Sequence, residues 1–126
     1  MTSHPVRSRT ARIAVALLAI LSFSVHAQAE LDAAQAKSLF NVRGCNACHE
    51  TGEQRIGPPY QVVALRYAAA YAADPVALID QLAVKIRHGG AGAWGSVPMV
   101  SNPSISQEEA ESISRWIMGL KQPTSP

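Results

Sequence analysis

The amino-acid sequence predicts an all-α fold, with about four helices in one small domain. Three observations indicate this class. Apolar residues recur at helical spacing in several segments, residues that favour helix caps stand where those segments begin, and clusters of glycine and proline separate the segments. The chain contains no internal repeat and no low-complexity tract. We therefore expect helices joined by loops.

The first helix is predicted to begin at Asp32, an N-cap residue with Gln35 three positions later, as in a capping box. It is expected to end near Gly44, and its apolar stripe consists of Ala33, Ala36, Leu39 and Phe40. Alanine and leucine dominate residues 59–72, where a second helix is expected.

The third helix has clear signals at both ends. Asp74 is an N-cap residue, and Pro75 stands at the first helical position, where proline is favoured. Gly89 is a natural C-cap. The apolar face consists of Ile79, Leu82 and Ile86.

The last helix shows the strongest amphipathic pattern. Ser106 is its expected N-cap, and Glu109 would complete a capping box. The predicted buried stripe consists of Ile113, Trp116, Ile117 and Leu120. Pro123 prevents the helix from continuing.

Residues 1–29 have the pattern of a secretory signal peptide. Three arginines (Arg7, Arg9 and Arg12) precede an apolar stretch at 13–25, and Ala27, Gln28 and Ala29 match a cleavage site before Glu30. The alternative is an uncleaved anchor, but the apolar stretch is shorter than the roughly 20 residues that a spanning helix needs. We expect residues 30–126 to form a periplasmic domain without stable membrane insertion.

The only two cysteines of the chain, Cys45 and Cys48, are followed by His49 in a Cys-x-x-Cys-His run. Thiols at this spacing can each add to one vinyl group of a porphyrin, and the adjacent imidazole can ligate the iron. The run predicts one covalently bound haem c, with His49 as an axial iron ligand. The alternatives are a thioredoxin-like redox pair, which needs a βαβ setting, and a zinc site, which needs four ligands.

Without the signal peptide, eight basic residues face nine acidic residues. This nearly neutral charge gives no electrostatic reason to expect nucleic acid or an anionic membrane as a partner. So short a domain also buries little apolar surface unaided. A haem would supply a large apolar body around which side chains can pack.

The segment 89–103, rich in glycine and proline, is predicted to provide the second axial ligand. Met99 follows Pro98, which excludes a helix, so its thioether can project from an extended loop. We therefore predict Met99 as the ligand, although a methionine can also simply fill the core. Met118 is expected to pack within the last helix or lie on the surface. His88 is expected to be solvated at a helix end, with bis-histidine ligation as the alternative.

From about residue 31 to residue 121 the chain resembles the short bacterial class I cytochromes c, which are small monohaem periplasmic electron carriers. The matching motifs, in the family's order, are Leu-Phe at 39–40, Cys-x-x-Cys-His at 45–49, Ile-Gly-Pro-Pro-Tyr at 56–60, Lys-Ile-Arg-His-Gly-Gly at 85–90, Gly-Ala-Trp-Gly-Ser-Val-Pro-Met at 92–99 and Ser-Arg-Trp-Ile at 114–117. The resemblance implies the class I cytochrome c fold, with the helices wrapped around the haem.

The resemblance also implies roles for residues around the haem. Pro58 matches the proline whose backbone carbonyl accepts the Nδ1–H of the proximal histidine, His49. Trp94 matches a tryptophan that packs at the haem edge and donates to a propionate, and Lys85 matches a basic residue near a propionate. Asn102 matches an asparagine close to the methionine sulfur.

Two further features follow from the resemblance. Phe40 and Trp116 match aromatic residues where the terminal helices cross. Residues 67–78 look longer than in the shortest members, so the connection between the second and third helices is expected to be extended.

Two filled axial positions leave no site for a substrate, so we expect an electron carrier whose donor and acceptor are periplasmic or membrane-bound redox proteins. The haem edge near Cys48 and the Met99 loop should approach the surface, where Val97, Val100 and Ile105 are candidates for a small docking patch. One alternative is the haem-bearing subunit of an oxidoreductase complex, such as a sulfite dehydrogenase or nitrite reductase system. The other is a peroxidase or gas sensor in which the methionine dissociates.

Overall fold

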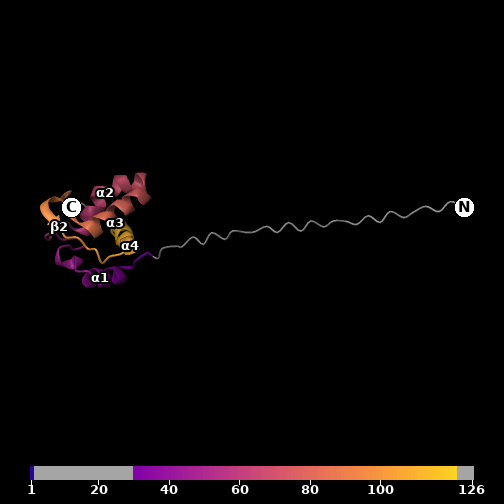
Figure 1. Ribbon diagram of the computed structural model, residues 1–126. Helices are drawn as coiled ribbons and strands as arrows, with labels where there is room; N and C mark the ends of the chain where they lie inside the picture. The colour runs from indigo at the N-terminus through magenta and orange to yellow at the C-terminus, as the bar shows by residue number, and fades with distance from the viewer. Residues whose placement is uncertain (2–29, 122–126) are drawn as a thin grey trace.

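Four α-helices form the frame of the domain within residues 30–121, which together with residue 1 are the part of the chain that the computed structural model describes (Figure 1). The helices are α1 (Ala33–Val42), α2 (Tyr60–Ala73), α3 (Pro75–His88) and α4 (Gln107–Met118), and a 3-10 turn, η1 (Cys45–Ala47), follows α1. The predicted all-α class and its helices are confirmed. The predicted signal peptide, residue 1 apart, and Pro123 lie outside the described residues.

The helix starts follow the capping signals of the sequence. The Asp32 carboxylate accepts from the backbone N–H of Gln35 at 2.8 Å, and the Gln35 side chain accepts from the backbone N–H of Asp32 at 2.9 Å, which completes the capping box of α1. Asp74 caps α3, and Ser106 caps α4 by accepting from the N–H of Glu109 at 3.1 Å. The predicted capping box of α4 was wrong in its second half, because the Glu109 carboxylate binds Arg43 instead.

The segment between α3 and α4 contains a small antiparallel hairpin, where the sequence predicts a loop. Strand β1 (Gly90–Gly92) pairs with β2 (Gly95–Met99), and Gly90 lies opposite Met99. The prediction failed because these strands are glycine-rich and almost wholly exposed, so apolar and polar residues do not alternate. Gly92 and Gly95 have positive φ angles of 97° and 114°, which glycine adopts easily at a tight turn.

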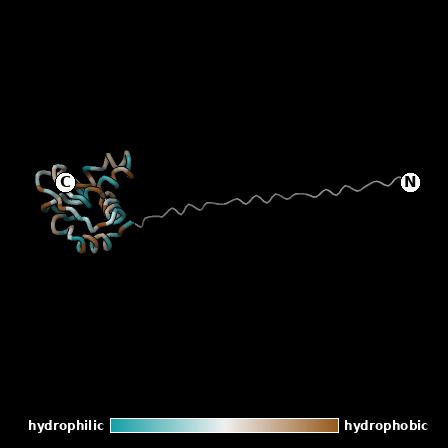
Figure 2. The backbone as a smooth tube through the Cα atoms, in the orientation of Figure 1, coloured by the Kyte–Doolittle hydropathy of each residue, from teal (hydrophilic) through white to brown (hydrophobic). Residues whose placement is uncertain are grey.

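The core lies between the helices, where α3 packs along α4 and α2 packs against both. Hydrophobic and hydrophilic residues alternate along the helical turns (Figure 2), as expected when each helix buries one face. The buried apolar helix residues are Ala36, Phe40, Tyr60, Ala64, Leu78, Ile79, Leu82, Ala83, Ile86, Ala110, Ile113, Ile117 and Met118. Leu120 lies beyond the end of α4 but still packs on the core.

Helix α1 crosses α4 through the predicted aromatic contact. The rings of Phe40 and Trp116 meet edge to face, with centroids 5.1 Å apart. Close by, the guanidinium of Arg43 binds the Glu109 carboxylate through two hydrogen bonds of 3.0 and 2.7 Å. These contacts join the residues just before the Cys-x-x-Cys-His run to the last helix.

The long stretch 67–78 is helical rather than looped. Helix α2 continues to Ala73, α3 begins at Pro75, and only Asp74 lies between them. The predicted extended connection between the second and third helices was therefore wrong, because the connection is only one residue long.

Candidate functional site

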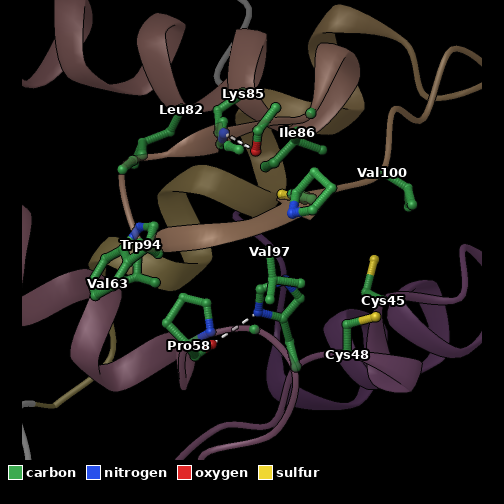
Figure 3. Close-up of a pocket in the computed structure, with 18 of the residues that line it drawn as sticks. Cys45, Cys48, Pro58, Val63, Leu82, Lys85, Ile86, Trp94, Val97 and Val100 are labelled. Carbon is green, nitrogen blue, oxygen red and sulfur yellow. Dashed lines mark hydrogen bonds between the residues drawn. The ribbon is translucent and has the colours of Figure 1, made fainter.

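A largely apolar cavity of about 750 Å³ opens between the Cys-x-x-Cys-His segment, α3 and the hairpin. Figure 3 shows Cys45 and Cys48 at one end of this cavity, Val63 and Trp94 at the other, and Leu82, Lys85 and Ile86 along one wall. All the site residues predicted from the sequence line it, namely Cys45, Cys48, His49, Pro58, Lys85, Trp94, Met99 and Asn102. The fold thus gathers residues from four separate segments around one space.

The 3-10 turn η1 holds the two cysteines in place. The backbone N–H groups of Cys48 and His49 both donate to the carbonyl of Cys45, at 3.1 and 3.0 Å. Both thiols are free, and partial burial raises the pKa of Cys45, partly offset by its own backbone N–H and by the nearby Arg43 cation. A raised pKa is the opposite of what a thioredoxin-like nucleophilic thiol needs, which argues against that alternative.

The His49 ring is oriented by three neighbours. Its Nδ1 lies 2.9 Å from the backbone carbonyl oxygen of Pro58, as the resemblance implied (Figure 3). Tyr60 stacks on the same ring, with centroids 5.4 Å apart and planes 15° apart. Gly57 packs so closely that an added Cβ would lie 2.8 Å from both ring nitrogens. With Nδ1 donating to the carbonyl, Nε2 keeps its lone pair free for a metal.

Met99 stands at the end of β2 and is half-buried at the cavity. On one side the hairpin pairs it with Gly90, and on the other its backbone packs against Gly89 at the end of α3. Gly89 has a φ of 66°, and a Cβ there would lie 2.7 Å from the carbonyl carbon of Val100. The Met99 backbone is thus confined from both sides.

Asn102 and Lys85 both bind backbone carbonyls near the Met99 loop. The Asn102 amide donates to the carbonyls of Ile86 and Val100, at 3.2 and 3.3 Å, so it helps cap α3. The ammonium of Lys85 donates to the carbonyl of Gly90 at 2.6 Å (Figure 3). These bonds fasten the hairpin and the Met99 loop to the end of α3.

Trp94 lies at the tip of the hairpin and contacts two neighbouring residues of α2. The guanidinium of Arg66 lies 4.4 Å from its ring centroid, and the Tyr67 ring meets it edge to face at 6.4 Å. A cation over an indole ring is attracted to its negative face. Both partners belong to α2, so Trp94 ties the hairpin to that helix.

The other candidate residues differ in their burial and in whether they line the cavity. Met118 is buried within α4 and does not line the cavity, as expected for a packing residue. His88 is exposed and lies at the cavity margin. Val97 and Val100 are 63% and 69% exposed, whereas Ile105 is 1% exposed and was a wrong candidate for the docking patch because it belongs to the core.

Several residues that shape the site cannot be identified from the sequence. Gly57 and Gly89 stood within motifs, but the sequence does not show which ring or backbone each glycine must approach. The Arg66–Trp94 contact and the Arg43–Glu109 pair join residues far apart in the chain. In the sequence, the only indication of these contacts is the presence of charged residues near otherwise apolar site residues.

The cavity fits a haem on its own chemistry. Two free thiols three positions apart lie at one end, an imidazole with its Nε2 free faces the space, and most of the lining is apolar. Within residues 30–121 no group of three or more His, Cys, Asp or Glu side chains is placed to hold a metal ion by itself. In the same range, no helix is long and apolar enough to cross a membrane.

Comparison with known proteins gives a consistent result. Residues 33–121 match the cytochrome c protein family. The chain is 39% identical over 85 residues to cytochrome c-552 of Hydrogenobacter thermophilus, a match that covers 68% of this chain and 81% of that protein. It is 35% identical over 83 residues to cytochrome c-551 of Pseudomonas aeruginosa, covering 66% of this chain and 74% of the relative.

Solved structures agree with this match. The crystal structure of cytochrome c552 from Nitrosomonas europaea superposes with a TM-score of 0.59 at 33% identity, covering 68% of this chain and 99% of that one. The shared fold and the paired thiols beside a free imidazole nitrogen lead to one conclusion. The chain belongs to the cytochrome c family, as a small class I electron-transfer protein that carries one covalently bound haem c.

Proposed function

We propose that this protein is a periplasmic electron carrier whose haem iron is ligated by His49 and Met99. The observation that carries the proposal is that His49 and Met99 line one cavity although they come from separate segments, and that the backbone around each is tightly confined. A methionine ligand raises the reduction potential relative to two histidines. It therefore suits a carrier that accepts electrons from quinol-side donors.

The bound haem supplies an iron that takes up and releases one electron between its ferric and ferrous forms. The protein side chains hold that site in one arrangement. Pro58 fixes the tautomer of His49, and Gly89 and Gly90 confine Met99, so neither ligand needs to move when the charge changes. If His49 and Met99 both held the iron, no position on it would remain for a substrate, which favours a carrier over an enzyme.

The residues that line the cavity favour fast electron exchange at one edge of the haem. Apolar side chains such as Val63, Leu82 and Ile86 exclude water from the interior. Beside Met99, Val97 and Val100 line the cavity and are also well exposed, so we place them at its rim, where they form a small apolar surface. A surface of this size suits brief encounters with a donor or acceptor rather than a permanent complex.

Export is part of the same proposal. Residues 1–29 have the composition of a signal peptide, and cleavage before Glu30 would leave the whole of helix α1 in the mature chain. The capping residue of α1, Asp32, follows the predicted cut by two positions. Haem attachment then takes place after export, outside the cytoplasm.

Spectra of the exported protein test the proposal. The full chain is produced in a bacterium that attaches haem c, and periplasmic wild type, Met99→Ala and Met118→Ala are compared in the ferric state. We expect a weak red sulfur-to-iron band in the wild type and in Met118→Ala, and its loss in Met99→Ala. An unchanged band in Met99→Ala contradicts the ligand assignment.

Two further measurements on the same samples test the other parts. Mass spectrometry should find a chain that begins at Glu30 and carries one haem, whereas a full-length chain in the membrane fraction contradicts export and cleavage. Copurification with a catalytic subunit at fixed stoichiometry would contradict the free carrier in favour of a complex subunit.

A further inference from the structure

The chain that follows Met99 is attached to the last turn of α3. The backbone N–H of Asn102 donates to the carbonyl of Arg87 at 2.9 Å, and the Asn102 amide donates to the carbonyl of Ile86 at 3.2 Å. Carbonyls at the end of a helix lack partners within the helix, so these bonds satisfy groups that would otherwise be unpaired. The segment 100–106 therefore depends on the end of α3.

The side chain of Arg87 adds a second attachment on the same segment. Its Nε donates to the carbonyl of Ile105 at 3.1 Å, and its Nη1 donates to the side-chain oxygen of Gln107 at 3.1 Å. Ile105 is a firm anchor because it is 1% exposed and its own N–H donates to the carbonyl of Asn102 at 3.1 Å. One residue thus holds the segment through its carbonyl and through its guanidinium.

Acidic side chains strengthen this arrangement indirectly. The amide of Gln107 donates to carboxylate oxygens of Asp80 and Glu111, both at 3.1 Å. The Gln107 oxygen is thereby turned toward the Arg87 guanidinium, and bonds from a charged donor are stronger than neutral ones. The guanidinium is half-buried, which reduces competition from water.

We propose that Arg87 is a positioning residue for the axial methionine. The hairpin holds Met99 on its upstream side through the pairing with Gly90, and Arg87 holds the downstream side through Ile105 and Gln107. Together they keep the thioether from leaving the iron. The inference rests on the proposed His49–Met99 ligation and adds what controls how firmly the methionine stays bound.

A simpler role for Arg87 would be its charge alone, since a cation in the last turn of a helix interacts favourably with the helix dipole. Lysine would serve that role equally well. A single ammonium does not reproduce the planar fork that reaches both the Ile105 carbonyl and the Gln107 side chain. Arg87→Lys therefore separates the two explanations.

Imidazole competition on the ferric holoprotein tests the proposal. Imidazole displaces a labile methionine, and the loss of the red sulfur-to-iron band reports both the rate and the equilibrium. We expect Arg87→Ala and Arg87→Lys to raise the rate and the equilibrium constant of displacement about tenfold, which corresponds to about 1.4 kcal/mol. Arg55→Ala is the matched control, because Arg55 also donates to a backbone carbonyl, that of Asn46, but on the His49 side of the haem site. It should change both quantities less than about twofold.

The remaining outcomes are distinguishable. If Arg87→Ala does not fold, Gln107→Ala removes only the Nη1 bond and should still raise displacement about threefold. If Arg87→Ala or Gln107→Ala has the same displacement rate and equilibrium constant as Arg55→Ala, the inference is overturned while the proposed His–Met ligation still holds. If Arg87→Lys, unlike Arg87→Ala, has the displacement rate and equilibrium constant of the wild type, the effect of Arg87 is due to its charge. That result also overturns the inference. If Met99→Ala keeps the red band, the proposed ligation itself is wrong, and the inference fails with it.

Discussion

Gly57→Ala should disturb His49, the proposed axial ligand, although Gly57 itself has no side chain that could bind the haem. A Cβ at this position would lie 2.8 Å from both nitrogens of the His49 ring, whereas ordinary van der Waals contacts begin near 3.4 Å. The ring or the backbone must therefore move by about half an ångström or more. The ring cannot simply retreat, because Tyr60 stacks on it and Pro58 accepts its Nδ1–H.

The expected cost is that of overpacking a well-packed site, about 1–3 kcal/mol in the free energy of unfolding. The 2.9 Å bond from His49 to Pro58 should weaken as the ring turns, so the basicity of the ligand and the reduction potential should change as well. Urea denaturation followed by far-UV circular dichroism measures the first effect, and a redox titration of the holoprotein measures the second.

Gly52→Ala is a suitable control for this substitution. It lies in the same loop, and a Cβ there would meet only the side-chain oxygen of Gln61, the flexible end of a long side chain. We expect it to change the free energy of unfolding by less than about 0.5 kcal/mol. If Gly57→Ala matches Gly52→Ala in both stability and potential, the proposed steric role of Gly57 is refuted.

Three other experiments test separate parts of the structure. Gly89→Ala combines a positive φ with a Cβ 2.7 Å from the carbonyl carbon of Val100. Urea titration should therefore show that the free energy of unfolding falls by about 2 kcal/mol or more, and the spectrum should show a weaker sulfur-to-iron band. Wild-type values of both would refute the close approach. Burial raises the pKa of the Tyr60 hydroxyl, which has no hydrogen-bond partner among the described residues. The unfolded chain releases this proton near pH 10 and the folded chain only at higher pH, so the free energy of unfolding should fall as pH rises above 10. Urea titrations at pH 8 and 10.5 should show a smaller fall in Tyr60→Phe than in the wild type. A double-mutant cycle on Arg43 and Glu109, whose side chains are 30% and 21% exposed, should give a coupling of about 1 kcal/mol, and zero coupling would show that the pair does not tie α1 to α4.

The helices were predictable because their boundaries are encoded locally. Asp32 with Gln35, and Asp74 with Pro75, bring the capping groups within three residues of the N–H groups that they satisfy or replace. Such signals do not depend on the rest of the fold. The same reasoning misassigned Glu109, whose carboxylate is taken by Arg43 from a position 66 residues away. A tertiary ion pair overrode a local pattern.

The hairpin was missed because its pairing leaves almost no trace in side-chain chemistry. β1 consists of two glycines and an alanine, and both strands are exposed except at Met99. Period-two burial, which normally reveals a strand, is therefore absent. The backbone pairing and the glycine turn define this element, and neither produces a hydrophobic pattern.

The predicted site residues that line the cavity could be named from the sequence, but not the groups that hold them. Cys45, Cys48 and His49 form a contiguous motif whose spacing is set by the cofactor. By contrast, the approach of Gly57 to His49 and the reach of Arg87 to Ile105 exist only after the chain has folded. The sequence identifies the chemistry of the site, and the structure identifies what keeps it rigid.

A redox titration of Met99→His tests the central claim of His49–Met99 ligation most directly. Replacing a methionine ligand by histidine should lower the midpoint potential by on the order of 0.1 V, since axial ligands dominate the potential of a haem. Met118→Leu, a volume-conserving change in the core of α4, should leave the midpoint unchanged. A midpoint of Met99→His equal to that of the wild type would contradict the ligation that we propose.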